Sequence, residues 1–232
     1  MQLLVSVSDV DEAQAALLGG AIVIDAKDPI LGALGAVSLD VFRGIHTLVG
    51  GIRPVSAALG DAVDEEAMEH TARAYAGAGA GFVKIGFAQP DDTRRAGSLI
   101  AAAVRGASPA GCAVIAATYA DHAGAVASRD ELVTVAANAG ATGVLIDTTD
   151  KAGPGLRSLV ATDVLTAWIA AAHDAGLIVS VAGKLTSDDL AWARDCGADI
   201  AGVRGAACIA GRTSRISAEN VRLLRALTSP ST

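Results

Sequence analysis

Four lysines are the residues of this sequence whose type and placement are best suited to chemistry. They are Lys27, Lys84, Lys151 and Lys184, and no other lysine occurs among the 232 residues. Each lies at or just beyond the carboxyl end of an apolar, β-branched run, whereas the helix-like segments carry arginine on their polar faces. A neutral lysine attacks carbonyl carbons to form an imine, so lysines gathered in one shielded site predict Schiff-base chemistry.

Carboxylates accompany these lysines. Asp25 precedes Lys27 by two residues in AIVIDAKDPILGALGA, and side chains alternate along a strand, so both should point to the same side. Lys84, at the centre of FVKIG, should point away from its apolar neighbours, and Asp147 ends the run GVLID. We therefore expect these four side chains in one pocket, joined by Lys151 from the next loop.

Lys27 must be neutral to act as a nucleophile, which means a fall in its pKa from ~10.4 toward ~7, worth roughly 4 to 5 kcal/mol. Burial and the ammonium groups of Lys84 or Lys151 would lower the pKa, whereas Asp25 would raise it. We expect Asp25 to position Lys27 and carry protons, with Asp25 or Lys84 as the base. The alternative for one lysine is a structural ion pair, but a ring of buried charges is costly unless it serves chemistry.

Two further glycine and cation pairs indicate phosphate binding. Gly183 and Lys184 lie in VAGKLTS, and Arg204 and Gly205 lie in GVRGAA. Loops at such places in a parallel barrel commonly bind phosphate through backbone N–H groups and a helix N-terminus. Ordinary turn glycines beside a surface lysine and arginine are the alternative.

The remaining polar signals are weaker. Asp121 and His122 end a further strand-like run and are candidate proton carriers. No HExxH motif, aspartate-rich loop or cluster of histidines occurs, so we expect neither a metal nor a cofactor. Cys112, Cys196 and Cys208 lack the spacing of a zinc site or a disulfide framework, and we expect them in the core.

The elements that position these residues follow one repeating plan. Five helix-like segments end in glycine and lead at once into a strand-like run, at 17–25, 76–86, 138–147, 174–183 and 195–205. Three further strand-like runs, at 3–7, 54–59 and 112–119, bring the number of expected strands to eight. This spacing predicts an α/β fold, a single-domain TIM (β/α)8 barrel over residues 1–232. An open doubly wound sheet is the alternative, although no dinucleotide fingerprint opens any helix.

Helices are expected at 8–19, 64–79, 128–140, 161–176 and 186–197, because each segment begins at a capping residue or acidic turn and keeps an apolar face. A net charge of -7 argues against a nucleic-acid partner but allows a small anionic substrate in a cleft of opposite field. The chain shows neither a signal peptide nor a membrane span, so we expect a cytoplasmic protein without membrane contact. Alanine-rich helices with few charges favour a homo-oligomer.

The sequence resembles the (5-formylfuran-3-yl)methyl phosphate synthases of methanofuran biosynthesis. The likeness begins with LLVSVSDVDEAQAALLGGAIVIDAKDPILGALGA and continues through FVKIG, TYAD, GVLIDTTDKAG, SVAGKL and ADIAGVRGAAC. The pattern D-x-K-x-P-x-x-G-x-L-G-A at 25–36 is its most specific part, since the glycine joints would fit many barrels.

The resemblance implies a barrel that condenses two molecules of glyceraldehyde 3-phosphate with loss of water and one phosphate. It implies that Lys27 forms the Schiff base beside Asp25, and that Lys84, Asp147 and Lys151 complete the site. The family carries one more lysine near the place of Asp121, His122 and Ala123, where His122 would replace it as a proton carrier. A class I aldolase, a sugar-phosphate isomerase and a non-catalytic phosphometabolite-binding barrel are the other functions that this fold allows.

Overall fold

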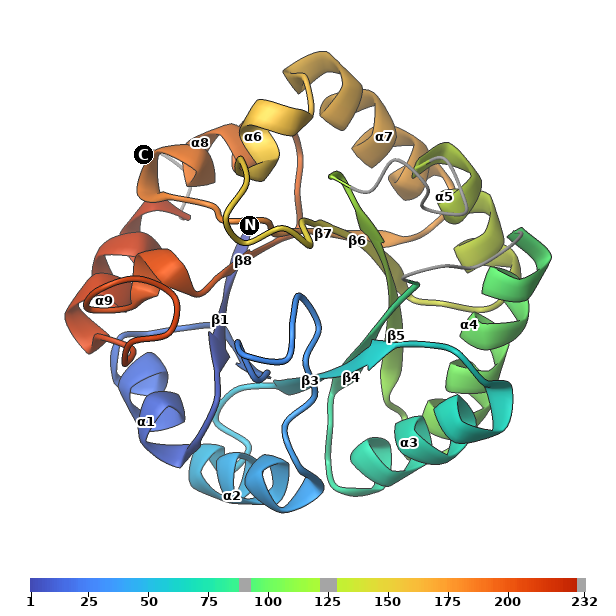
Figure 1. The fold of residues 1–232 in the computed structure, drawn as a ribbon, viewed down its shortest axis with the longest axis horizontal. Helices are drawn as coiled ribbons and strands as arrows, with labels where there is room; N and C mark the ends of the chain where they lie inside the picture. Colours follow the sequence, from blue (N-terminus) through green and yellow to red (C-terminus); the bar gives the residue numbers. More distant parts are fainter. Residues whose placement is uncertain (88–92, 122–128, 229–232) are drawn as a thin grey trace.

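Eight parallel strands close into a barrel in the order β1 to β8, with the helices outside it (Figure 1). The computed structural model describes residues 1–87, 93–121 and 129–228. The strands are β1 Gln2–Val7, β2 Val23–Ala26, β3 Val55–Asp61, β4 Phe82–Gly86, β5 Ala113–Tyr119, β6 Gly143–Asp147, β7 Ile178–Val181 and β8 Ile200–Val203. The pairing of β1 with β8 confirms the expected TIM barrel and excludes the open doubly wound sheet.

Helices follow the strands: α1 Val10–Leu18, α2 Leu39–Val49, α3 Glu65–Gly77, α4 Thr93–Ala107, α5 Arg129–Asn138, α6 Leu156–Leu159, α7 Thr162–Asp174, α8 Ser187–Asp195 and α9 Ala218–Leu227, with short 3-10 turns η1 Ser108–Ala110 and η2 Gly205–Ala207. The five helices expected from the sequence are confirmed as α1, α3, α5, α7 and α8. Asp9 and Asp64 cap α1 and α3 by accepting hydrogen bonds from Glu12 and Ala67. Gly140, after α5, has φ +81°, the left-handed conformation that lets a helix turn at once into a strand.

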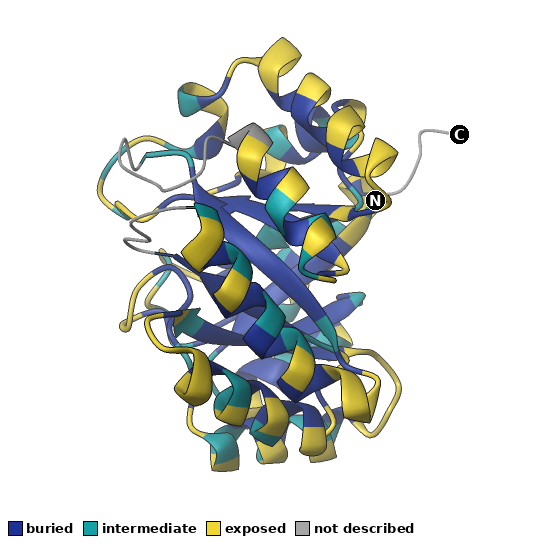
Figure 2. Cartoon of the chain, turned by 90° about the vertical axis from the view of Figure 1, so that its right-hand side faces the viewer, coloured by how far each residue is buried: buried dark blue, intermediate teal, exposed yellow. Residues whose placement is uncertain are grey.

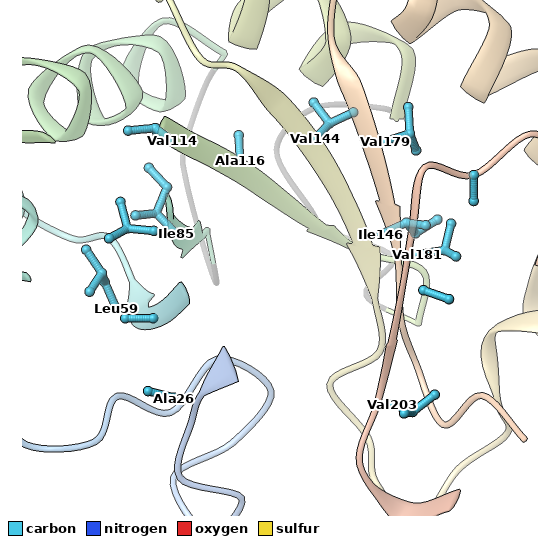
Figure 3. Packing of buried hydrophobic residues seen from close by; sticks show 14 of the residues in the cluster. Ala26, Leu59, Ile85, Val114, Ala116, Val144, Ile146, Val179, Val181 and Val203 are labelled. Carbon is cyan, nitrogen blue, oxygen red and sulfur yellow. The ribbon is translucent and has the colours of Figure 1, made fainter. Parts of the chain in front are cut away.

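Side chains on the outer face of the strands build the main core. Ile24, Val83, Val144 and Val179 are buried between the barrel and the helices, and Figure 3 shows this layer around β4 to β8. The strands are buried except at a few end residues, such as Gln2 of β1, Asp61 of β3 and Ile178 of β7, and the helices expose their outer faces (Figure 2). Because alternate residues of each strand face the helices, the remaining ones turn toward the barrel axis.

The segment between β2 and α2 folds over the end of the barrel, where Figure 1 shows it in blue inside the ring of strands. Its Ala33 and Leu34 pack on inward-facing residues of β3, β5 and β6, among them Tyr119. The N–H of Asp28 donates to the carbonyl of Gly35 at 2.9 Å and closes the segment. A Cβ on Gly35 would lie 2.5 Å from the Asp28 oxygen, so this position requires glycine.

The three cysteines are buried and unpaired, as the sequence indicated. Among residues 1–87, 93–121 and 129–228, no helix is long and apolar enough to cross a membrane.

Candidate active site

Asp25 lies at the base of the site and is fully buried. Ser6 and Ser56 donate to its two oxygens at 2.8 and 2.7 Å, and Lys84 Nζ donates at 2.6 Å. The strand register explains this contact, because Ser6 and Ser56 are the direct neighbours of Asp25 on β1 and β3. Burial acts to raise the pKa of Asp25, but the ammonium groups of Lys84 and Lys27 and the hydrogen bonds lower it overall. Asp25 is therefore an ionised anchor for Lys84.

Lys27 lies one residue beyond β2 and is 8% exposed. Its backbone N–H donates to the Val7 carbonyl at 2.9 Å, which extends the ladder with β1 and fixes the direction of the side chain. Burial lowers the pKa of Lys27 from 10.5 to about 8; Asp147 opposes this shift and the ammonium group of Lys84 adds to it. Both the direction and the cause agree with the expectation from the sequence.

Asp147 ends β6 and links two of the lysines. Its Oδ2 lies 3.9 Å from Lys27 Nζ, and its Oδ1 lies 3.3 Å from Lys151 Nζ. The N–H of Thr148 donates to the same Oδ1 at 2.7 Å, and Lys151 also donates to the Thr148 carbonyl. Asp147 Oδ2 is thus the carboxylate oxygen that faces Lys27.

A cavity of about 710 Å³ opens beside these residues and reaches helix α9. Six cationic side chains line it, and Asp147 is the one carboxylate among its described lining residues; the cations are Lys27, Lys84, Lys151, Lys184, Arg204 and Arg212. This excess of positive charge occurs in a protein whose net charge is -7. The cavity therefore attracts small anions, because the charges that line a cleft lie nearest to an entering ligand and the surrounding protein concentrates their field.

The loop after β7 places Gly183 and Lys184 on the cavity wall. A Cβ on Gly183 would lie 2.9 Å from Thr148 Cγ2, so glycine allows this loop to approach β6 closely. Lys184 has φ +57°, a strained conformation for a residue with a side chain, and its ammonium group donates to the Gly153 carbonyl. Gly205, after β8, lines the same cavity.

Arg204 lines the cavity but directs most of its donors into the protein. It donates to the two oxygens of Glu12 at 2.8 and 3.2 Å, to the Ser6 carbonyl at 3.0 Å and to the Arg212 carbonyl at 2.6 Å. This network ties α1 and β1 to the loop after β8. Arg204 is therefore placed to support that loop, with little of its donor capacity left for a phosphate.

Asp121, expected as a proton carrier, lies at the edge of the site. Its carboxylate accepts hydrogen bonds from the backbone N–H groups of Thr149 at 2.8 Å and Asp150 at 2.7 Å. It thereby holds the loop after β6, which carries Lys151. His122 and Ala123 lie outside the described residues, so the role expected of His122 stays a prediction.

A hydrogen bond between buried Tyr119 and exposed Asp61, at the end of β3, was not expected from the sequence. The Tyr119 hydroxyl donates to Asp61 Oδ1 at 2.6 Å, and burial, followed by Asp61, raises the pKa of Tyr119 strongly. A Cβ on Gly86 would lie 2.3 Å from the Tyr119 hydroxyl and 2.2 Å from Asp61 Oδ1, so a side chain at the end of β4 would displace this pair. The TYAD run and the glycine of FVKIG were visible, but nothing in the sequence joined them to Asp61.

The pKa of Lys27 predicts how imine formation depends on pH. When the pH is below the Lys27 pKa of about 8, the amine is mostly protonated and cannot attack a carbonyl carbon. We therefore expect the rate of imine formation to rise with pH and to level off above about pH 9. At pH 7 roughly one tenth of the amine is neutral, against roughly one part in 3000 for an unperturbed lysine. Borohydride trapping at a fixed time across this range measures the profile. A rate that kept rising up to pH 10.5 would contradict the lowered pKa.

The chain is similar to known proteins in sequence and in fold. Residues 3–225 match the family model described as 4-HFC-P synthase. A (5-formylfuran-3-yl)methyl phosphate synthase of Methanopyrus kandleri is 36% identical over 92% of both chains, and one of Methanothermobacter thermautotrophicus is 34% identical over 98% of both. A 3-hexulose-6-phosphate synthase structure from Salmonella typhimurium superposes with a TM-score of 0.72 at 18% identity, covering 98% of both chains, and this likeness concerns the fold alone.

Proposed function

The chain belongs to the 4-HFC-P synthase family, and we propose that it condenses two molecules of glyceraldehyde 3-phosphate into (5-formylfuran-3-yl)methyl phosphate. Water and one phosphate leave, and the product serves methanofuran biosynthesis. The observation that carries the proposal is Lys27, a buried amine with a pKa of about 8 inside a cavity lined by cations. Such an amine attacks an aldehyde, and such a cavity attracts a phosphorylated one.

Lys27 begins the reaction. Its neutral amine adds to the aldehyde carbon of one substrate molecule, and loss of water from the resulting carbinolamine leaves an iminium ion. The iminium withdraws electrons from the neighbouring carbon and makes its proton acidic. Asp147 Oδ2, 3.9 Å from Lys27 Nζ, is the nearest carboxylate oxygen and takes that proton. The enamine then expels phosphate or adds to the second aldehyde.

Lys84 supplies positive charge and a proton on the floor of the site. Its ammonium group is held at 2.6 Å from Asp25, and both residues are buried. An ammonium fixed in this way stabilises the alkoxide that forms when the enamine adds to a carbonyl carbon. Asp25 acts through Lys84 and is a positioning residue, which replaces the earlier alternative of Asp25 as the base.

The phosphate of the substrate molecule bound to Lys27 is assigned to the cavity wall that the loops after β7 and β8 form. Lys184, with the backbone of Gly183 and Gly205, offers an ammonium group and N–H donors in the cavity that Lys151 also lines. Arg204 supports this wall through Glu12 and contributes its charge more than its donors.

Product analysis tests the function against its alternatives. We expect the purified protein, incubated with glyceraldehyde 3-phosphate, to produce the near-ultraviolet absorbance of a conjugated furan aldehyde together with free phosphate. A class I aldolase or isomerase would give sugar phosphates without a furan. Binding without turnover would favour the non-catalytic barrel.

The proposal also covers the protein as a whole. We propose a single catalytic domain over residues 1–232 that works in the cytoplasm without a metal or cofactor, and with a small phosphorylated aldehyde as its partner. A homo-oligomer remains part of it, because Ile30, Leu31 and Ile209 expose 81%, 65% and 71% of their surface. Light scattering of the purified protein measures that state.

A further inference from the structure

Arg212 differs from the other cations that line the cavity. Each of those has a partner: Lys27 and Lys151 lie beside Asp147, Lys84 beside Asp25, Arg204 beside Glu12, and Lys184 donates to the Gly153 carbonyl. Within residues 1–87, 93–121 and 129–228, no hydrogen bond or ion pair joins the Arg212 guanidinium to another residue. Its charge is therefore available to a ligand.

The backbone of Arg212 is held in place although its side chain has no protein partner. Arg204 Nε donates to the Arg212 carbonyl at 2.6 Å, and Arg204 is itself fixed by Glu12. A Cβ on Gly205 would lie 3.7 Å from Arg212 Cβ, an ordinary van der Waals distance, so Arg212 lies beside η2. Arg204 and η2 thus fix the backbone position from which the Arg212 side chain extends. Because the backbone is already ordered, less conformational entropy is lost when Arg212 binds a ligand.

The charges around Arg212 favour an anion. Partial burial is the main cause that lowers the pKa of Arg212, the guanidinium of Arg204 adds to it, and Asp147 acts in the opposite direction. The Arg212 guanidinium therefore lies within electrostatic reach of the Asp147 carboxylate and of the Arg204 guanidinium. A phosphate placed against it would supply the missing counter-charge and accept two parallel hydrogen bonds, the geometry in which arginine binds phosphate most strongly.

The cavity also has room beyond Lys27. From the inward-facing Leu4 at its floor it continues past β8 to Asn220 and Leu223 of α9. Its volume of about 710 Å³ suits a drug-sized ligand, whereas one triose phosphate is much smaller. A condensation of two such molecules needs both in the cavity at once, and each carries a phosphate.

We propose that Arg212 binds the phosphate of the second glyceraldehyde 3-phosphate, the molecule that does not form the imine with Lys27. This inference rests on the proposed function. Arg212 would then determine specificity for the second substrate, holding its aldehyde toward the enamine at Lys27, while the wall formed by Gly183 and Lys184 binds the first phosphate.

The test separates the two substrate molecules. We expect Arg212→Gln to raise the glyceraldehyde 3-phosphate concentration needed for half-maximal furan formation by about 10- to 100-fold. Borohydride trapping of a single substrate molecule on Lys27 should stay within about twofold of the wild type. Arg212→Lys should recover part of the loss, because it restores the charge without the planar pair of donors.

Arg215→Gln is the matched control, since Arg215 lies in the same loop but is exposed and pairs with Asp9 and Asp11. It should form furan at the wild-type rate. An equal loss of trapping and furan formation in Arg212→Gln, or no loss of either, would overturn the inference. A wild-type protein that forms neither imine nor furan would instead refute the proposed function, so the two failures are distinguishable.

Discussion

Replacing Lys27 by methionine abolishes the borohydride adduct and lowers furan formation by at least about 10³-fold, while the folded protein becomes more stable. The loss follows from removal of the only atom proposed to bond to the substrate. The gain follows because Lys27 is a buried cation whose pKa is lowered from 10.5 to about 8. At about 1.36 kcal/mol per pKa unit, that shift corresponds to a cost on the order of 3 kcal/mol.

The sign of this cost gives a second measurement. Lys27 binds a proton more weakly in the folded chain than in the unfolded one, so its cost is present in full below pH 8 and disappears as the pH rises toward 10.5. We therefore expect Lys27→Met to have a free energy of unfolding about 1–2 kcal/mol higher than the wild type at pH 7, measured by urea denaturation. Asp147 does not lose its counter-ion, because Lys151 stays beside it. The advantage should shrink near pH 10. Mass mapping of the wild-type adduct to Lys84 or Lys151 would refute the assignment of Lys27.

Replacing Asp25 by asparagine lowers the free energy of unfolding by about 3–5 kcal/mol. The change leaves Lys84 as a buried cation, 3% exposed, without its counter-charge. Urea denaturation followed by circular dichroism measures this loss. Furan formation should fall as well, because the Lys84 ammonium group is no longer held in place.

A double-mutant cycle isolates the buried pair. We expect the combined variant Asp25→Asn with Lys84→Met to lose at least about 2 kcal/mol less than the sum of the two single losses. The control is the surface pair Asp40 and Arg43, with side chains 91% and 58% exposed, whose coupling should not exceed about 1 kcal/mol. Additive losses at Asp25 and Lys84 would show that the pair is not a coupled unit.

Most of the fold could be predicted because its signals are local. The glycine at each helix end, as at Gly140, marks the place where a strand must begin, and the apolar runs place both strand faces in contact with protein. Strand alternation then directed Lys84 and Asp147 inward without any knowledge of their partners. These inferences need only a few neighbouring residues, which is why they were confirmed.

The rest of the site depends on contacts between distant residues. Arg204 was expected to bind phosphate, but Glu12, 192 positions away, accepts its donors in a buried ion pair. Ser6 and Ser56 looked like small strand residues until the register brought them beside Asp25. Arg212 lies in an irregular loop where no periodicity indicates the direction of its side chain.

The β2–α2 segment that folds over the barrel end has a kinetic consequence. Ala33 and Leu34 pack on inward-facing residues of β3, β5 and β6, whereas the described cavity beside Lys27 is lined by the loops after β7 and β8 and by α9. If the proposed Lys27 adduct forms, water that hydrolyses it and the second aldehyde that captures it therefore share the space of this cavity. An incoming substrate molecule displaces the water that would otherwise return the first one to solution, which biases the partition toward carbon–carbon bond formation.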